Sequence, residues 1–201
     1  MNLKQIHDEG LKKLELVYGK GKNSTKRYTD KGISHTYIDV YDKLFSRLRD
    51  KEISLMEIGI RYGTCLDMWS KYFPKSEIHG IDKPEKLIEY PMKDVGLSDK
   101  CDEYGFPIPN NENVHVYGIN VEDEEKVNEV FEGQEFDIII DDASHVITLQ
   151  KTIYNLFFHR LKTPGIYVIE DIKYPNVENI KKLNKNIEII DMRDLNGKQD
   201  N

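Results

Sequence analysis

The sequence contains few cysteines and no long apolar run. Its two cysteines, Cys65 and Cys101, lie far apart, and neither belongs to a spacing typical of a metal site. This pattern favours a reduced, cytoplasmic protein. The opening residues, MNLKQIHDEG, lack the apolar core of a signal peptide, and no apolar stretch approaches the length of a membrane span. We therefore expect no membrane partner.

An excess of basic charge is also missing. The net charge is −7 at pH 7, with lysines scattered through an acidic background, and this argues against a nucleic-acid partner. The local exception is residues 19–32, GKGKNSTKRYTDKG, which contain Lys31 among other basic residues. No strand precedes them and no G-x-x-x-x-G-K-[ST] pattern fits them. We interpret this stretch as a mobile basic segment, with contact to an anionic substrate as the alternative.

The hydrophobic pattern predicts strands alternating with helices in a single domain, residues 1–201. Residues 1–50 form a helical lead-in segment, with amphipathic helices over 3–17 and 34–48. The predicted strands are 53–60, 77–82, 113–120, 136–141, 165–171 and 186–192, and the predicted helices between them are 65–73, 122–133 and 147–161. This order is typical of βαβ units with right-handed crossovers. The fold class is therefore α/β, a Rossmann-like doubly wound and mostly parallel sheet with helices on both faces.

Two segments depart from this regular pattern. Residues 84–112 are rich in turn formers and long for a connection between neighbouring strands, which fits a lid or binding element, with local disorder as an equal alternative. The last residues, DMRDLNGKQDN, end where a final apolar strand is expected. We therefore expect the final strand of the sheet to be missing from this chain.

Polar residues lie at or just beyond the carboxyl ends of the first five predicted strands. Ligands of an open parallel sheet bind beyond the carboxyl ends of its strands, at the point where the strand order reverses. Solvated strand caps would explain any one of these residues, but they explain the whole set poorly. The set comprises Glu57, Gly59, Asp82, Asn120, Asp141, Asp142, His145, Glu170 and Asp171.

The first candidate sub-site combines EIGIRYG, residues 57–63, with the GID that ends the next strand. Gly59 and Gly63 let the backbone turn tightly beside a ligand, and Asp82 can accept both hydroxyls of a ribose. The spacing is not G-x-G-x-x-G, so the dinucleotide fingerprint is absent. Glu57 disfavours a nearby pyrophosphate and suits a cationic, phosphate-free cofactor such as S-adenosylmethionine.

The second candidate sub-site contains Asp142, Glu170 and Asp171. Neighbouring parallel strands lie about 4.8 Å apart, so these carboxylates converge if their strands are adjacent. Carboxylates this close repel unless they share a cation, and oxygen ligands favour Mg²⁺, or Mn²⁺ or Ca²⁺. His145 lies at the rim, where an imidazole is a natural general base. The alternative is that His145 merely neighbours a helix cap at Ser144.

Three stretches carry a resemblance to a known family: LMEIGIRYGTCLDMWSKYFPKSEIHGID, FDIIIDDASHV and GIYVIEDI. Together they resemble class I S-adenosylmethionine-dependent methyltransferases. More narrowly, they resemble the metal-dependent sugar O-methyltransferases of the macrocin and mycinamicin type, in the group that includes cephalosporin-hydroxylase-like members. The resemblance covers roughly residues 28–192.

This resemblance implies specific roles for named residues. Asp142, Glu170 and Asp171 would be metal ligands, and His145 would be the general base, with Asp142 beside it in catalysis. The residues that would hold or cover the cofactor are Glu57, Gly59, Tyr62, Gly63, Asp82, Asn120, Asp141, His35 and Tyr37.

The function that we expect is S-adenosylmethionine-dependent O-methylation of a hydroxyl, most simply on a sugar or glycan. The partners would be a small-molecule or glycan acceptor, and a homo-oligomer is left open. Two alternatives stay open at this point. One is a nicotinamide-dependent oxidoreductase on a similar sheet, and the other is a non-catalytic cofactor-binding module.

Overall fold

The computed structural model describes the whole chain except residues 22–26, 34, 90–91, 93–96, 102–106 and 193–201. Its centre is a five-stranded sheet in the order β5-β2-β1-β6-β7, and every neighbouring pair is parallel. The strands are β1 (Ser54–Ile58), β2 (Glu77–Asp82), β5 (Val114–Gly118), β6 (Phe136–Asp141) and β7 (Leu161–Ile169). The predicted Rossmann-like sheet is confirmed.

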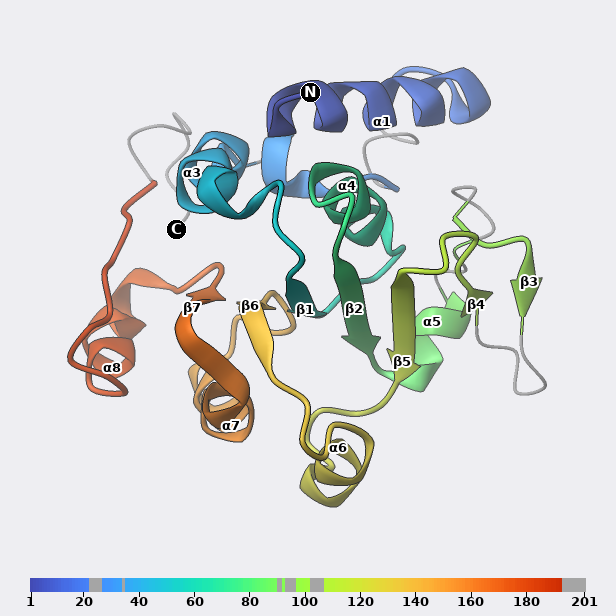
Figure 1. The fold of residues 1–201 in the computed structure, drawn as a ribbon. Helices are drawn as coiled ribbons and strands as arrows, with labels where there is room; N and C mark the ends of the chain where they lie inside the picture. The colour runs from blue at the N-terminus through green and yellow to red at the C-terminus, as the bar shows by residue number, and fades with distance from the viewer. Residues whose placement is uncertain (22–26, 34, 90–91, 93–96, 102–106, 193–201) are drawn as a thin grey trace.

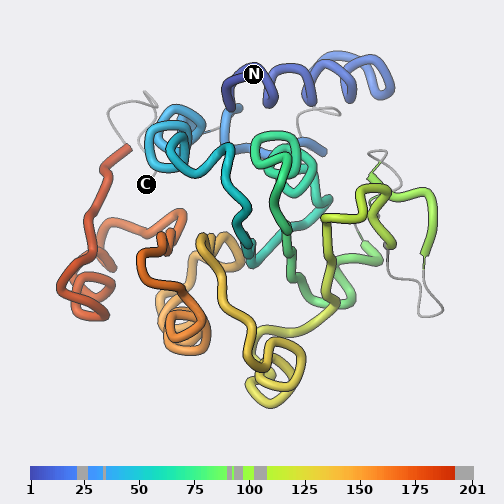
Figure 2. Tube along the Cα trace, viewed as in Figure 1, coloured from blue at the N-terminus to red at the C-terminus, as the bar shows by residue number. Residues whose placement is uncertain are grey.

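Helices cover both faces of this sheet (Figure 1). One face carries α1 (Leu3–Tyr18), α3 (Tyr37–Phe45) and α4 (Thr64–Tyr72), and the other carries α6 (Glu124–Val130) and α7 (Ile147–Phe157). Alternate residues of a strand point to opposite faces, so Leu55 joins the first core and Met56 the second. The short helix α8 (Val177–Lys181) lies beside α7, as the tube in Figure 2 also shows.

Short 3₁₀ turns link several of these elements: η1 (Asp30–Gly32), η2 (Ser46–Leu48), η4 (Phe158–Arg160) and η5 (Tyr174–Asn176). No helix in the described part of the chain combines the length and the apolar character that a membrane span requires.

The predicted insertion, residues 84–112, contains helix α5 (Pro84–Glu89) and a two-stranded antiparallel ribbon. The ribbon strands are β3 (Lys100–Cys101) and β4 (Pro107–Ile108). Much of the segment lies outside the described residues, so the lid stays a prediction.

Two sequence predictions about elements were wrong. The strand predicted at 186–192 is absent from the described residues 187–192, because they pair with no strand and β7 forms that edge of the sheet. The helix predicted to reach residue 161 ends at Phe157, and β7 begins at Leu161 rather than 165. Leu161 pairs with Phe136 across the sheet, and this strand pairing outweighs the helical pattern.

Candidate active site

The strand order places the candidate site between β1 and β6. The chain runs from β1 outward to β2 and β5, then crosses back to β6 on the other side of β1. The register pairs Ile58 with Asp141 and Asp141 with Ile169, so three strands end side by side. Backbone bonds continue past these ends, from Asp142 to Ile58 and from Glu170 to Asp141, both 2.9 Å long. The positions of Asp142 and Glu170 are therefore fixed by the sheet itself.

Three carboxylates meet at this edge. Glu57, Asp142 and Glu170 each offer an oxygen, and these oxygens lie within 4.8 Å of one another. Glu57 and Glu170 are buried, and Asp142 is partly exposed. We call this set the carboxylate cluster. It confirms that Asp142 and Glu170 converge, as the sequence predicted, and it adds Glu57.

The ammonium of Lys31 lies inside the carboxylate cluster. Its Nζ is 2.7 Å from Asp142 Oδ2, 2.7 Å from Glu170 Oε1 and 3.1 Å from Glu57 Oε1. The Lys31 side chain is only 1% exposed. The interpretation of Lys31 as part of a mobile basic segment was therefore wrong, because three carboxylates hold its charge inside the protein.

Two aromatic side chains complete the surroundings of the cluster. Trp69 Nε1 donates to Glu57 Oε2 at 2.9 Å, and the buried Tyr41 hydroxyl donates to Glu170. Burial raises the pKa of Glu170 to about 8, and the Lys31 charge opposes that rise. Burial likewise raises the pKa of Asp142, again against the effect of Lys31. The roles of Lys31, Tyr41 and Trp69 were missed because nothing in their sequence spacing links them to residues 142 and 170.

Asp171 points to a different group of side chains. Its carboxylate accepts a hydrogen bond from the Tyr37 hydroxyl and lies 4.0 Å from His35 Nε2 and 3.7 Å from His145 Nδ1. The Asp171 backbone has φ 51°, a left-handed conformation that turns the chain directly after Glu170. The structure thus places the predicted ligands Asp142 and Glu170 together and Asp171 beside them, with the imidazoles.

His145 and the stacked rings of His35 and Tyr37 lie around Asp171. The His145 side chain is 49% exposed, so its ring is accessible at the rim. The rings of His35 and Tyr37 are stacked, with centroids 4.7 Å apart. Burial and the bond to Asp171 raise the pKa of the Tyr37 hydroxyl, which keeps it a proton donor. The predicted residues His35, Tyr37 and His145 are therefore neighbours through Asp171.

The glycine loop after β1 approaches β6 closely. Gly59 has φ 91°, and a Cβ there would lie 2.4 Å from the carbonyl oxygen of Asp142. Gly63 has φ 72° and precedes α4 as its N-cap. The neighbouring Tyr62 ring lies 5.5 Å below the Arg61 guanidinium. Any side chain at position 59 would collide with the Asp142 and Ala143 backbone, so glycine is what allows the loop to pass this close to the residues after β6.

Asp82 ties this loop to the end of β2. Its Oδ2 accepts from the backbone N–H groups of Ile60 and Arg61, at 3.0 and 2.8 Å, and Oδ1 accepts from Lys83 N at 2.8 Å. A carboxylate has about four acceptor sites, so Asp82 keeps capacity for a ligand hydroxyl. Asn120 lies one strand further out and accepts from Glu122 N at 3.2 Å.

Asp141 is a buried carboxyl with an unused acceptor. Its Oδ1 accepts from Ala143 N at 3.3 Å, whereas Oδ2 has no hydrogen-bond partner among the described residues. Burial raises the pKa of Asp141 to about 7. Buried polar atoms are rarely left unpaired, so Oδ2 fits a hydrogen-bond donor from a ligand.

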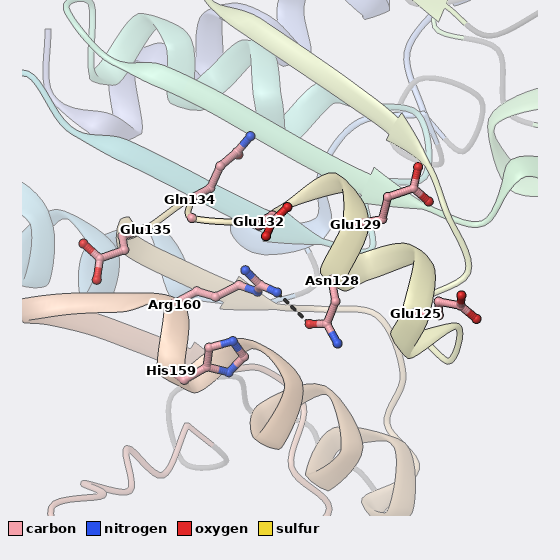
Figure 3. Close-up of a pocket in the computed structure, with 9 residues that line it drawn as sticks. Glu125, Asn128, Glu129, Glu132, Gln134, Glu135, His159 and Arg160 are labelled. Carbon is pink, nitrogen blue, oxygen red and sulfur yellow. Dashed lines mark hydrogen bonds between the residues drawn. The ribbon is translucent and has the colours of Figure 1, made fainter.

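A surface hollow elsewhere on the protein is distinct from this site (Figure 3). It is lined by residues of α6, η4 and the turn before β6, including Glu132, Glu135 and Arg160. Glu135 precedes β6, whereas Asp141 ends it, so the hollow lies at the opposite edge of the sheet.

Curated relatives resemble the chain over about three quarters of its length. It is 30% identical to the 8-demethyl-8-(2-methoxy-alpha-L-rhamnosyl)-tetracenomycin-C 3'-O-methyltransferase of Streptomyces olivaceus over 161 residues, 76% of this chain and 36% of that protein. It is 28% identical to the mycinamicin VI 2''-O-methyltransferase of Micromonospora griseorubida, over 74% of this chain and 35% of that protein. The chain therefore spans about a third of the length of these relatives. No protein-family model matches it.

Solved structures agree on the fold. The MycE methyltransferase of the mycinamycin biosynthetic pathway, in complex with Mg, SAH and mycinamycin VI, is 25% identical and has a TM-score of 0.56, over 81% of this chain and 39% of that one. A precorrin-6y C5,15-methyltransferase from Geobacter metallireducens is 12% identical, with a TM-score of 0.51 over 78% of this chain and 75% of that one, and it bears on the fold alone. The chain thus has the class I methyltransferase fold and is similar to the sugar O-methyltransferases of the macrocin and mycinamicin type.

Proposed function

We propose that this chain binds S-adenosylmethionine and transfers its methyl group to a hydroxyl of a sugar or glycosylated small molecule. The observation that carries this proposal is the junction of β1 and β6, where the glycine loop, the carboxylate cluster and the Asp171 group meet. The relatives supply the reaction class, since their names describe methylation of sugar hydroxyls.

The cofactor site uses the ends of β1, β2 and β6. The absence of a Cβ at Gly59 lets the glycine loop pass close to the Asp142 and Ala143 backbone, and Asp82 keeps acceptor capacity for a ribose hydroxyl. The unpaired Asp141 Oδ2 suits a donor such as an exocyclic amine. Asn120 and Tyr62 lie in the loops after β5 and β1, and we propose that His35 and Tyr37, which neighbour Asp171, cover the cofactor.

A divalent cation fits the donor chemistry of the neighbouring carboxylates. Asp142 and Glu170 would hold it with their oxygens, with Glu57 as the third carboxylate of the cluster. Asp171, the next residue after Glu170, is the further ligand that we propose. Carboxylate oxygens suit Mg²⁺, and also Mn²⁺ or Ca²⁺. Such an ion supplies Lewis acidity that orients an acceptor hydroxyl and lowers its pKa.

In this proposal His145 acts as the general base. Its side chain is 49% exposed, and Asp171 at 3.7 Å from Nδ1 can orient the ring. The acceptor hydroxyl oxygen attacks the methyl carbon in line with the departing sulfur, so the O–C bond forms as the S–C bond breaks. The hydroxyl proton passes to the neutral imidazole, and S-adenosylhomocysteine leaves uncharged at sulfur.

The test is transfer of a labelled methyl group from S-adenosylmethionine to a panel of free and glycosidic sugars. His145→Ala should lower turnover by roughly 10²–10⁴-fold, the usual effect of losing a positioned base, while cofactor affinity stays unchanged. His159→Ala changes an exposed histidine at the opposite edge of the sheet and serves as the matched control.

The metal requirement is tested in the same assay. EDTA should abolish turnover and Mg²⁺ should restore it, because the acceptor hydroxyl depends on the cation. Full turnover in EDTA would contradict the metal requirement, and a wild-type rate in His145→Ala would contradict the assignment of the base.

A further inference from the structure

The inference concerns Lys31, and it rests on the proposed function. Its ammonium contacts Asp142 Oδ2 and Glu170 Oε1, both at 2.7 Å, in a buried position. These two residues are also the central ligands expected for the divalent cation. We propose that Lys31 and a divalent cation compete for the same carboxylates, so that the cation binds only when the ammonium withdraws.

The geometry makes the two occupants mutually exclusive. Mg²⁺ binds carboxylate oxygens at about 2.0–2.1 Å, so an ion bridging Asp142 Oδ2 and Glu170 Oε1 would take the space that Lys31 Nζ fills. An ion on the other oxygens of the same two carboxylates would lie close to the ammonium and be repelled strongly in a site with little water around it. One of the two must leave.

The charge balance explains both the presence of Lys31 and its replacement. Three carboxylates packed within 4.8 Å repel one another, and Lys31 supplies a single positive charge among them. Trp69 and Tyr41 add neutral donors to Glu57 and Glu170 but no charge. A divalent ion carries twice the charge of the ammonium, so the cluster can favour it when it is available.

The Lys31 backbone is anchored, which confines the exchange to its side chain. The Tyr28 and His7 rings pack edge to face with centroids 5.0 Å apart, so α1 holds the segment. At Gly32 a Cβ would lie 2.7 Å from His7 ring atoms, which shows how closely the chain passes α1. Lysine has a flexible four-carbon stem, so the ammonium can move out while residues 28–32 stay in place.

The first test measures Mn²⁺ binding by calorimetry in wild type and Lys31→Met. Methionine keeps much of the side-chain volume but removes the competing charge, so Mn²⁺ should bind at least about tenfold more tightly. Lys162→Met is the matched control, because Lys162 pairs with Asp137 at 2.8 Å at the far edge of the sheet. Mn²⁺ affinity in Lys31→Met equal to or weaker than wild type would overturn the proposal.

The second test uses the wild-type protein and so does not depend on the variant folding. Lys31 is labelled with an amine-acetylating reagent, with and without Mn²⁺, and its modification rate is followed by peptide mass spectrometry. The rate should rise about tenfold with Mn²⁺ as the ammonium is released, whereas the surface lysine Lys83 should not change. Continued protection of Lys31 when calorimetry shows Mn²⁺ bound would overturn the proposal.

The outcomes separate this inference from the proposed function. If only Lys31→Met binds Mn²⁺, competition is supported and the metal requirement of the native protein is wrong. If wild type binds Mn²⁺ while Lys31 stays protected, the metal site survives and competition fails. If neither protein binds Mn²⁺, the proposed competition and the proposed metal site are both wrong.

Discussion

At the scale of single residues, Gly59 sets the distance between the glycine loop and the carboxylate cluster. Gly59→Ala adds a Cβ 2.4 Å from the Asp142 carbonyl oxygen and places it on a backbone with φ 91°. We expect the unfolding free energy to fall by roughly 3 kcal/mol, because alanine disfavours a left-handed backbone and its Cβ would clash with backbone atoms that cannot easily move. Urea unfolding of wild type and Gly59→Ala measures this difference.

Gly133→Ala is the control for that prediction. Gly133 has φ 68°, but a Cβ there meets nothing within 4 Å, so only the backbone cost of about 1 kcal/mol remains. Equal losses in the two variants would show that the approach to Asp142 is not tight.

The sequence predicted which residues lie at the strand ends. It did not predict that Asp142 and Glu170 would join the carboxylate cluster while Asp171 would contact Tyr37 and the histidines instead. Asp142 and Glu170 could be placed together because the ends of adjacent strands meet at one edge. The separation of Asp171 depends on its left-handed backbone, which no pattern in the sequence encodes. The burial of Lys31 depends on contacts over more than a hundred residues of sequence, beyond the reach of local periodicity.

At the scale of elements, the inner strands were predictable and the terminal one was not. Runs such as FDIIID are apolar on both faces, as buried parallel strands require. NIEIIDM shows similar composition, yet residues 187–192 join no strand of the described structure. A strand is stabilised by a partner, and composition alone does not supply one.

The pairing of β2 with β5 predicts a pH effect on stability. His79 on β2 packs beside His115 on β5, with ring centroids 4.8 Å apart. Burial, followed by repulsion from His115, lowers the pKa of His79 to about 4. The folded protein therefore binds fewer protons than the unfolded chain between about pH 6.5 and 4, so stability falls as the pH drops through that window.

His79→Gln should remove most of this loss, which we expect to be roughly 2 kcal/mol after allowing for the partial exposure of the ring. Urea unfolding at several pH values between 4 and 7 measures the difference from wild type. His159→Gln, which changes an exposed histidine, should leave the pH profile as it is. A wild-type pH dependence in His79→Gln would show that this histidine is not the source.

At the scale of the whole molecule, the chain presents a class I methyltransferase sheet whose carboxyl edge gathers all the candidate groups. It spans about a third of the length of its curated relatives, 36% in the tetracenomycin case. The fold follows from the alternation of strands and helices, whereas the reaction class that we propose rests on the similarity to the relatives. Choice of acceptor depends on surfaces that sequence periodicity does not describe.

The most direct test of the central claim is calorimetry with S-adenosylhomocysteine. We predict that wild type binds this product, that NADH does not compete, and that Asp82→Ala weakens binding at least about tenfold, because a carboxylate acceptor is lost from the ribose site. Glu132→Ala, at the opposite edge of the sheet, should bind like wild type. Absence of S-adenosylhomocysteine binding by the folded wild-type chain, or its displacement by NADH, would contradict the account.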